Sequence, residues 1–311
     1  MNHTVENNLT KSCTLFSEER FARAVANASN DQLQPVKVST RSGTVMYGIA
    51  YQSRFGLRHL SLSYFGLYEH PRIIGNYANE VRDLVGNLKS WRMTGFEWNV
   101  RYDHAELANE LRNCGLSCTQ STTHVLKLTG CHEAVFSGYN ATIRNQVRRA
   151  LREGVVVRQA EDDATVIAYY EIHESLALQK GNYKHLHRIE LFKELLKLRD
   201  DIVFLVAEID NTVIAGGWFF RDGDSLFHWH GAMNRAYSKV FPTCSVIDAA
   251  IQIGCRDGFS TFNMGGSAGI STLEQFKTSW GADCQTVWQF SWHNPIWRAV
   301  RRLRNAMQSN A

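Results

Sequence analysis

The sequence feature that most constrains the fold is an internal repeat. The segment 44–51 (TVMYGIAY) recurs at 212–219 (TVIAGGWF), with the Thr-Val pair, a glycine and a closing aromatic residue at matching positions. Farther along, 95–99 (GFEWN) recurs at 258–263 (GFSTFN). Two matches in the same order predict a duplicated unit. Because strand-like and helix-like runs alternate in each copy, the predicted fold class is α/β.

Length and composition limit the remaining classes of protein. At 311 residues the chain suits two domains of ordinary size, and its 44% hydrophobic and 21% charged residues are typical of a soluble globular protein. No apolar run approaches the roughly 20 residues of a membrane span. The N-terminus is polar and has no apolar segment of the signal-peptide kind. We therefore expect a cytoplasmic protein without a membrane span.

The seven cysteines indicate neither a disulfide framework nor a zinc site, because their number is odd and no Cys-x-x-Cys pair occurs. One group of metal-ligating residue types lies close together in the sequence, but three of its members flank a strand-like run. The group comprises Cys114, Cys118, His124, Cys131 and His132. We expect no metal ion.

Hydrophobic periodicity and turn residues predict the order of the elements. In the first copy we expect a helix at 18–28, antiparallel strands at 35–40, 43–53 and 58–65, a helix at 76–91, a strand at 96–101, a helix at 104–114 and a strand at 122–129. In the second copy we expect strands at 155–159, 202–209, 213–220, 225–233, 259–264 and 285–292, with helices at 163–180, 188–198 and 243–256. An amphipathic basic helix is expected at 296–307.

A glycine-rich stretch after the strand at 259–264 is the first candidate site. Gly265 and Gly266 leave room for backbone amides to approach a ligand. Ser271 and Glu274 have the spacing of a capping box that opens a short helix, and this helix carries Lys277. The pattern predicts a lysine within reach of whatever the loop admits. The alternative is an ordinary turn followed by a surface lysine.

The helix expected at 140–153 has a basic stripe. Arg144, Arg148 and Arg152 recur every four residues, Arg149 lies beside them, and only Glu153 opposes them. An arginine ladder of this kind repels itself, so it indicates binding to phosphate. The alternative is a solvated helix face.

Several other residues are candidates for substrate binding. Tyr64 and Tyr68 lie in an aromatic, turn-rich segment that either lines a pocket or simply packs. His228 and His230, two residues apart on one strand, are predicted to share a face of it. They are either acid/base groups or partnered structural histidines. The polar segment after that strand carries Tyr237, which we include among the substrate-binding candidates.

These residues together resemble the Fem family, the aminoacyl-tRNA-dependent transferases that build the interpeptide bridges of peptidoglycan. The resemblance covers roughly 35–290 and is carried by 144–157, 207–233 and 258–281, where a glycine-rich turn precedes Phe-Lys and an aromatic-Gly stop. It implies two tandem GNAT-like acyltransferase units. The implied domains are residues 1–130 (first GNAT-like domain, on the acceptor side), 131–154 (basic connecting helix) and 155–311 (second, catalytic domain).

The resemblance also implies an activity. An amino acid would pass from an aminoacyl-tRNA to the amine of a peptidoglycan precursor or of a peptide-like natural product, without a cofactor. Phe276 and Lys277 would stabilise the oxyanion of the tetrahedral intermediate, with the ammonium held near the aromatic ring. A monomer is favoured. The family's coiled-coil arm is absent, and the polar loop after Lys180 partly stands in its place.

Two other functions stay open. One is an N-acyltransferase that takes its acyl group from coenzyme A or an acyl carrier. Such enzymes bind pyrophosphate on a glycine-rich loop, and the corresponding segment 234–243 contains no glycine and includes Pro242, which argues against coenzyme A. The other is a non-catalytic binding module, against which Lys277 and the neighbouring glycines count.

Overall fold

The computed structural model describes residues 15–29, 33–52, 58–64, 67–68, 70–90, 93–179 and 187–295. The chain divides into two compact units. Unit 1 comprises residues 1–121 and 286–311, and unit 2 comprises residues 122–285. These limits differ from the boundaries expected at 130 and 154, because the basic helix and the end of the preceding strand pack within unit 2. The helix expected at 296–307 lies outside the described residues.

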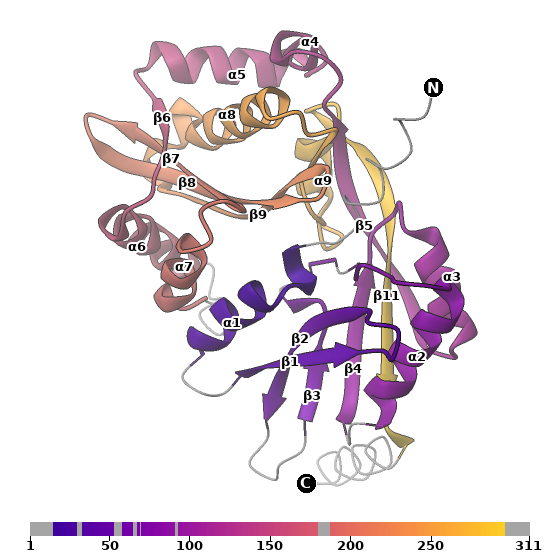
Figure 1. Cartoon of the computed structure of the whole chain (residues 1–311). Helices are drawn as coiled ribbons and strands as arrows, with labels where there is room; N and C mark the ends of the chain where they lie inside the picture. Colours follow the sequence, from indigo (N-terminus) through magenta and orange to yellow (C-terminus); the bar gives the residue numbers. More distant parts are fainter. Residues whose placement is uncertain are drawn as a thin grey trace, which may run out of the picture. The chain divides into compact units, whose positions relative to one another are not determined.

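Unit 1 is built on a sheet with the strand order β1-β2-β3-β4-β11. The first three strands are antiparallel, which confirms the predicted meander, and β4 runs parallel to β3. Figure 1 labels the elements. They are a 3-10 turn (Leu15–Ser17), α1 (Glu19–Asn27), β1 (Leu33–Ser39), β2 (Val45–Gln52), β3 (Arg58–Ser61), α2 (Tyr77–Ser90), β4 (Met93–Val100), α3 (Ala105–Asn113) and β11 (Asp283–His293).

The core of unit 1 lies between its sheet and the apolar face of α2. Val81, Leu84, Val85 and Leu88 recur at helical spacing, and each is at most 2% exposed. They pack in one cluster with Trp98 of β4. The predicted amphipathic helix is therefore confirmed, with limits one residue shorter at each end.

Unit 2 has the strand order β5-β10-β9-β8-β7-β6. Its helix α4 has no counterpart in the sequence prediction. The elements are β5 (Ser117–Lys127), α4 (His132–Ser137), α5 (Ala141–Arg152), β6 (Val156–Gln159), α6 (Asp163–Gln179), α7 (Ile189–Leu196), β7 (Ile202–Ile209), β8 (Thr212–Asp222), β9 (Ser225–Met233), a 3-10 helix (Arg235–Val240), α8 (Pro242–Arg256), β10 (Thr261–Asn263) and α9 (Ser271–Thr278). No helix in the described part of the chain is long and apolar enough to cross a membrane.

The strand pairing within the two units confirms the repeat, and each repeat contributes its last strand to the other unit. In unit 1, β1, β2, β3 and β4 have the pairing directions that β7, β8, β9 and β10 have in unit 2. The strand that follows α3 is β5, which pairs antiparallel with β10 of unit 2. The strand that follows α9 is β11, which pairs antiparallel with β4 of unit 1. The repeats thus share one topology, and each completes the sheet of the other.

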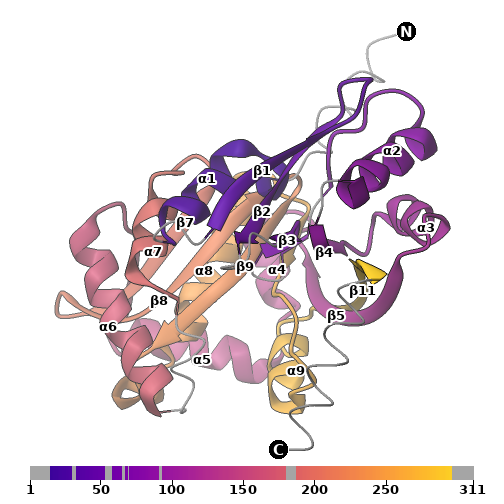
Figure 2. The same cartoon turned by 90° about the horizontal axis from the view of Figure 1, so that it is seen from below.

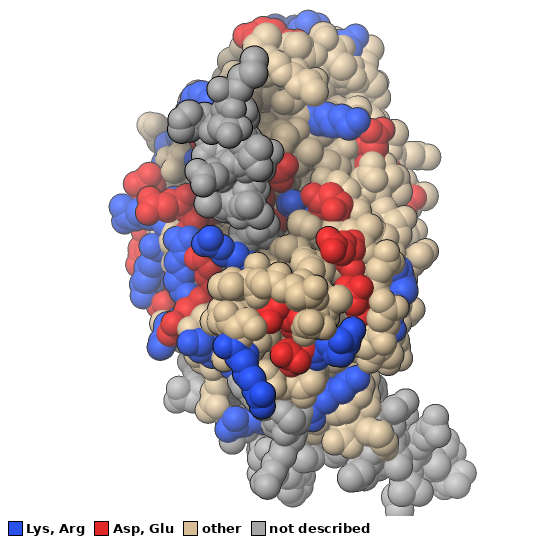
Figure 3. Space-filling model, turned by 45° about the vertical axis from the view of Figure 1, so that its right-hand side comes forward, with Lys and Arg blue, Asp and Glu red and all other residues tan. Residues whose placement is uncertain are grey.

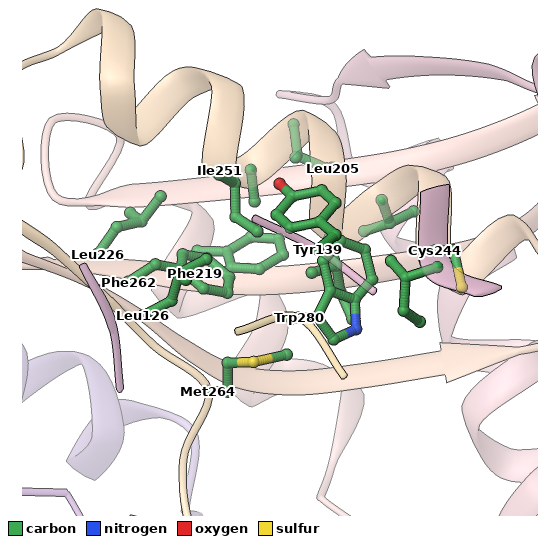
Figure 4. Packing of buried hydrophobic residues seen from close by; sticks show 14 of the residues in the cluster. Leu126, Tyr139, Leu205, Phe219, Leu226, Cys244, Ile251, Phe262, Met264 and Trp280 are labelled. Carbon is green, nitrogen blue, oxygen red and sulfur yellow. The ribbon is translucent and has the colours of Figure 1, made fainter. Parts of the chain in front are cut away.

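In unit 2, helices cover both faces of the sheet. Helices α5 and α8 lie on one face and α6 and α7 on the other (Figures 1 and 2). The α8 face contains a hydrophobic core in which Tyr139, Phe219, Phe262 and Trp280 are at most 1% exposed. Figure 4 shows these rings together, with Met264 of the glycine-rich stretch at their edge. The site described next rests against this core.

Candidate functional site

The glycine-rich loop begins where β10 ends, and a buried amide holds it. Asn263 is 1% exposed, and its Oδ1 accepts hydrogen bonds from Thr123 Oγ1 at 2.7 Å and from the amide of Gly265 at 2.9 Å. The amide of Gly265 is thereby occupied, whereas its carbonyl faces the interior. Asn263 and Thr123 were not among the predicted site residues. Asn263 could have been identified from the sequence, because it is a polar residue at the end of an apolar strand. Nothing in the sequence links Thr123 to Asn263.

Three glycines of this loop are required by geometry. Gly265 has φ +73°, which L side chains rarely adopt, and Gly269 has φ +75°. At Gly266 an added Cβ would lie 3.0 Å from the carbonyl oxygen of Thr122, so the requirement there is close approach. The predicted glycine loop is confirmed as a backbone conformation, and its glycines also let it pass close to β5.

Lys277 is buried beneath this loop rather than exposed on the surface. Its side chain reaches back from α9, so that Nζ donates to the carbonyls of Gly265 at 2.9 Å and Gly266 at 2.6 Å. The residue is 6% exposed, and burial lowers the pKa of its ammonium to about 8. An ammonium has three N–H donors. Among the described residues the third has no acceptor, so it is available to a ligand.

Two neutral imidazoles flank the ammonium. Burial and, to a smaller extent, the nearby cation of Lys277 together lower the pKa of His228 to about 4. The pKa of His124 is lowered for the same two reasons, in the same order. The ring nitrogen Nδ1 of His124 is buried without a partner among the described residues. Glu274 acts on the ammonium of Lys277 electrostatically, but among the described residues no carboxylate forms an ion pair with it, so its charge can attract an incoming anion.

The sheet of unit 2 opens beside Lys277 and His228. Strand β9 pairs with β10 only from Ser225 to Phe227. Beyond that point β9 continues to Met233, while the chain after β10 turns toward β5, where the amide of Met264 donates to His124 O. The described residues provide no strand partner for this part of the β9 edge. A backbone edge of this kind can pair with an extended ligand.

Two predicted details of α9 are wrong, namely its capping box and the contact between the Lys277 ammonium and the Phe276 ring. The helix begins at Ser271, so Ile270 is its N-cap, and no side chain caps it, which excludes the capping box. Among the described residues no cation–π contact joins Lys277 to Phe276. Adjacent residues on a helix point in different directions. Phe276 instead packs at 6.1 Å, edge to face, against Trp280, so its contribution is to fix α9 on the core.

His228 and His230 do not share a face of β9, so that prediction is wrong. The register with β8 shifts between them, with Phe219 opposite His228 and Trp218 opposite His230. Because Phe219 and Trp218 point to opposite faces of the sheet, this bulge turns the imidazoles apart. His228 stacks on Phe219 at 4.9 Å, whereas His230 Nδ1 lies 2.6 Å from the hydroxyl of Tyr169 on the α6 side.

His230 therefore joins an aromatic cluster on the face of α6. Its ring meets that of His173 edge to face at 4.4 Å. Burial lowers the pKa of His173 to about 4 and holds that of His230 well below its ordinary value. Both rings are neutral at physiological pH, and their environment favours the interpretation of structural histidines.

The predicted arginine stripe is partly used inside the protein. Arg144 donates to the carbonyls of Ser137, the last residue of α4, and Tyr139, two residues farther along. Arg148 lies 5.4 Å from the ring centre of Phe136. Partners of this kind explain how four arginines coexist on one helix.

The two remaining arginines of α5 differ in their partners. Arg149 pairs with Glu153 at 3.3 Å and lies 5.5 Å from the ring of Phe241. Arg152 is exposed and has no ion-pair partner among the described residues. Figure 3 shows Lys and Arg interspersed with Asp and Glu on one face of the molecule, in keeping with a net charge of +4. The arginines best placed to meet an external phosphate are therefore Arg148 and Arg152.

Each predicted tyrosine is at least partly buried within its own unit. Tyr64 lies in unit 1, with its ring 6.0 Å from that of Tyr51, and burial raises its pKa. Tyr68, also in unit 1, is 5% exposed. Tyr237 is partly buried against the unit 2 core.

In the described part of the chain, no group of three His, Cys, Asp or Glu residues is suited to hold a metal ion.

Comparisons with known proteins agree with this architecture. A family model described as an acetyltransferase (GNAT) domain matches residues 137–278. FemX is similar in structure, with a TM-score of 0.71 and 14% identity over 94% of this chain and 96% of that chain. L-PGS from Bacillus licheniformis gives 0.59 and 10% over 92% and 95%. A tandem GNAT protein from the clavulanic acid biosynthesis pathway gives 0.51 and 8% over 88% and 87%. No curated protein matches the chain in sequence.

These findings show that the chain has a tandem GNAT acyltransferase fold, as the sequence predicted. More particularly, the fold is Fem-like, since the similarity to FemX extends over nearly all of both chains.

Proposed function

We propose that this protein is an aminoacyltransferase that moves an amino acid from an aminoacyl-tRNA to the amine of a peptide-like acceptor, such as a peptidoglycan precursor. One observation carries the proposal: a buried ammonium, Lys277, held by two carbonyls with its third N–H available. The Fem-like fold supports this class of reaction. The segment 234–243, which has no glycine, disfavours coenzyme A as the donor.

The reaction requires stabilisation of one transient charge. The neutral acceptor amine attacks the ester carbonyl carbon, and the carbonyl oxygen becomes an oxyanion that accepts the third N–H of Lys277. The intermediate collapses by breaking the bond between that carbon and the ribose oxygen. The proton lost by the amine nitrogen ends on the departing oxygen, which yields an amide and a free tRNA hydroxyl. A preorganised donor of this kind contributes about 3 to 4 kcal/mol to transition-state stabilisation.

The neighbouring imidazoles have a different part in this proposal. A pKa of about 4 makes His228 a poor base at neutral pH, so it does not deprotonate the amine. The amine therefore reacts in its neutral form. His228 and His124 add no negative charge beside Lys277 and help to exclude water from it.

A transfer assay with two donors tests the proposal. The protein is incubated with a pool of labelled aminoacyl-tRNAs, or with labelled acetyl-CoA, and with amine acceptors that include a peptidoglycan precursor peptide. We expect label in the acceptor only with the tRNA donor. Transfer from acetyl-CoA alone would establish the N-acyltransferase alternative, and transfer from neither donor at any pH would leave the binding module as the function.

The basic stripe gives a separate prediction about the donor. We expect the double substitution Arg148→Gln and Arg152→Gln to weaken tRNA binding and to reduce the slope of log K against log salt by roughly two, since each phosphate contact contributes about one. Arg144 is left unchanged because it caps α4. Filter binding at several salt concentrations measures the slope. Arg199→Gln with Arg256→Gln, two exposed arginines elsewhere in unit 2, is the matched control, and a parent-like slope in the stripe variant would exclude phosphate contact there.

A further inference from the structure

A cavity of about 490 Å³ lies on the α6 side of the unit 2 sheet. One wall is a single face of α6, on which residues recur at helical spacing. The other wall is formed by the turn that precedes β8, the start of β8, the end of β9 and the residues that follow it. Its floor is apolar and includes Ile172, Val213 and Met233. A volume of this size suits a small organic ligand or the end of a peptide.

This cavity is separate from the surroundings of Lys277. The glycine loop meets β9 at His228, where Gly265 lies beside the His228 carbonyl. The cavity meets β9 at Met233, five residues farther along, which is roughly 16 Å in an extended strand. It is also bounded by α6, whereas His228 faces the core under α8. The reaction proposed for Lys277 therefore makes no use of it.

Among the described residues that line the cavity, one is negatively charged and one is positively charged. Glu171 comes from α6, and Arg235 comes from the 3-10 helix that follows β9. Both side chains are exposed, and among the described residues neither has an ion-pair partner. They come from different elements and do not pair with each other. The other described residues of the rim are uncharged and include Ser175, Gln179 and Thr212.

We propose that this cavity binds a small zwitterion, an amino acid or a short peptide with free ends, as a second binding site of the protein. Glu171 binds the ammonium of the ligand, Arg235 binds its carboxylate, and the apolar floor takes its side chain. An anionic ligand such as a nucleotide fits less well, because Glu171 repels it and Arg235 is a single cation. The proposal concerns binding alone and does not depend on aminoacyl transfer.

Calorimetric titration with three forms of one dipeptide tests the proposal. The probes are alanyl-leucine, its N-acetyl derivative and its C-terminal amide. We expect the full-length protein to bind the free dipeptide about fivefold more tightly than either blocked form, since a single exposed charge pair is worth at most about that factor. Equal affinity for all three forms, or no binding of the free dipeptide, would overturn the proposal.

Single substitutions test which residue binds each end of the ligand. Glu171→Gln should weaken binding of the free dipeptide about fivefold and abolish the effect of N-acetylation, and Arg235→Met should do the same for amidation. Glu174→Gln, on the same helix, and Lys239→Met, on the same 3-10 helix, are matched controls outside the cavity lining and should bind as the parent does. Lys277→Met should also bind as the parent does; a loss of binding there, or parent-like binding by both rim variants, would place the ligand elsewhere.

Discussion

Lys277→Met is expected to lower the turnover of aminoacyl transfer about a hundredfold. The substitution keeps the aliphatic stem within its buried channel and deletes only the charge and its three donors. A hundredfold loss corresponds to about 3 kcal/mol of transition-state stabilisation, the range observed when one oxyanion donor is removed. Because the donor acts on charge that develops during the reaction, the loss should appear in kcat, with KM nearly unchanged.

The same substitution also leaves two loop carbonyls without a donor, since Nζ binds both Gly265 O and Gly266 O. A loss of activity could therefore reflect a displaced loop. The thermal unfolding midpoint separates the two effects: we expect it to change by only a few degrees, because deleting a buried ammonium also removes its desolvation cost. Lys239→Met, an exposed lysine, is the control for the chemical change itself. A variant that folds and turns over at the parent rate would reduce Lys277 to a support for the loop.

Trp280→Ala is expected to lower the stability of unit 2 by about 3 to 5 kcal/mol. Trp280 is 0% exposed and lies two residues after the end of α9, with its ring 4.8 Å from that of Tyr139, edge to face. Figure 4 shows the two rings in contact within the core. The substitution leaves a large cavity where α9 is fixed, so the site should loosen as well. Thermal unfolding followed by near-ultraviolet circular dichroism should show a midpoint lower by roughly 10 °C.

Two further variants make this prediction specific. Trp280→Phe keeps an aromatic ring against Tyr139 and removes an indole N–H that has no partner among the described residues, so it should cost less than half as much. Trp288→Ala removes a partly buried tryptophan of β11 in unit 1 and should also cost less. Equal effects of all three substitutions would mean that Trp280 has no special place in the core.

Local patterns predicted most of the elements. The strand at 202–209 was placed at its observed limits, and the helix with Arg144 begins one residue after its predicted Asn140, which caps it through a hydrogen bond to the amide of Ile143. These features depend on periodicity and on turn and cap residues within a few positions. The repeat likewise predicted that both units share one topology.

The errors concern contacts between distant segments. The exchange of β5 and β11 between the sheets is a matter of partner choice, which no local pattern specifies. The side that His230 faces depends on a one-residue bulge, and a period of two cannot reveal it. The predicted stripe assumed unpaired arginines, but the carbonyls that bind Arg144 come from the end of another helix. For the site, the sequence identified Lys277 and its glycines but not Thr123, which lies 140 positions from Asn263.

The central claim is that the ammonium of Lys277 accelerates transfer, and the pH dependence of that acceleration tests it most directly. The measurement is the ratio of the parent turnover to that of Lys277→Met from pH 6 to 9.5, since a ratio cancels the titration of the acceptor amine. The pKa of Lys277 is lowered to about 8, so its charge is present below that pH and is lost as the pH rises through it. We predict a ratio of about 100 up to pH 7 that falls tenfold for each unit well above pH 8. A ratio that stays constant across the range, or that rises above pH 8, would contradict the claim.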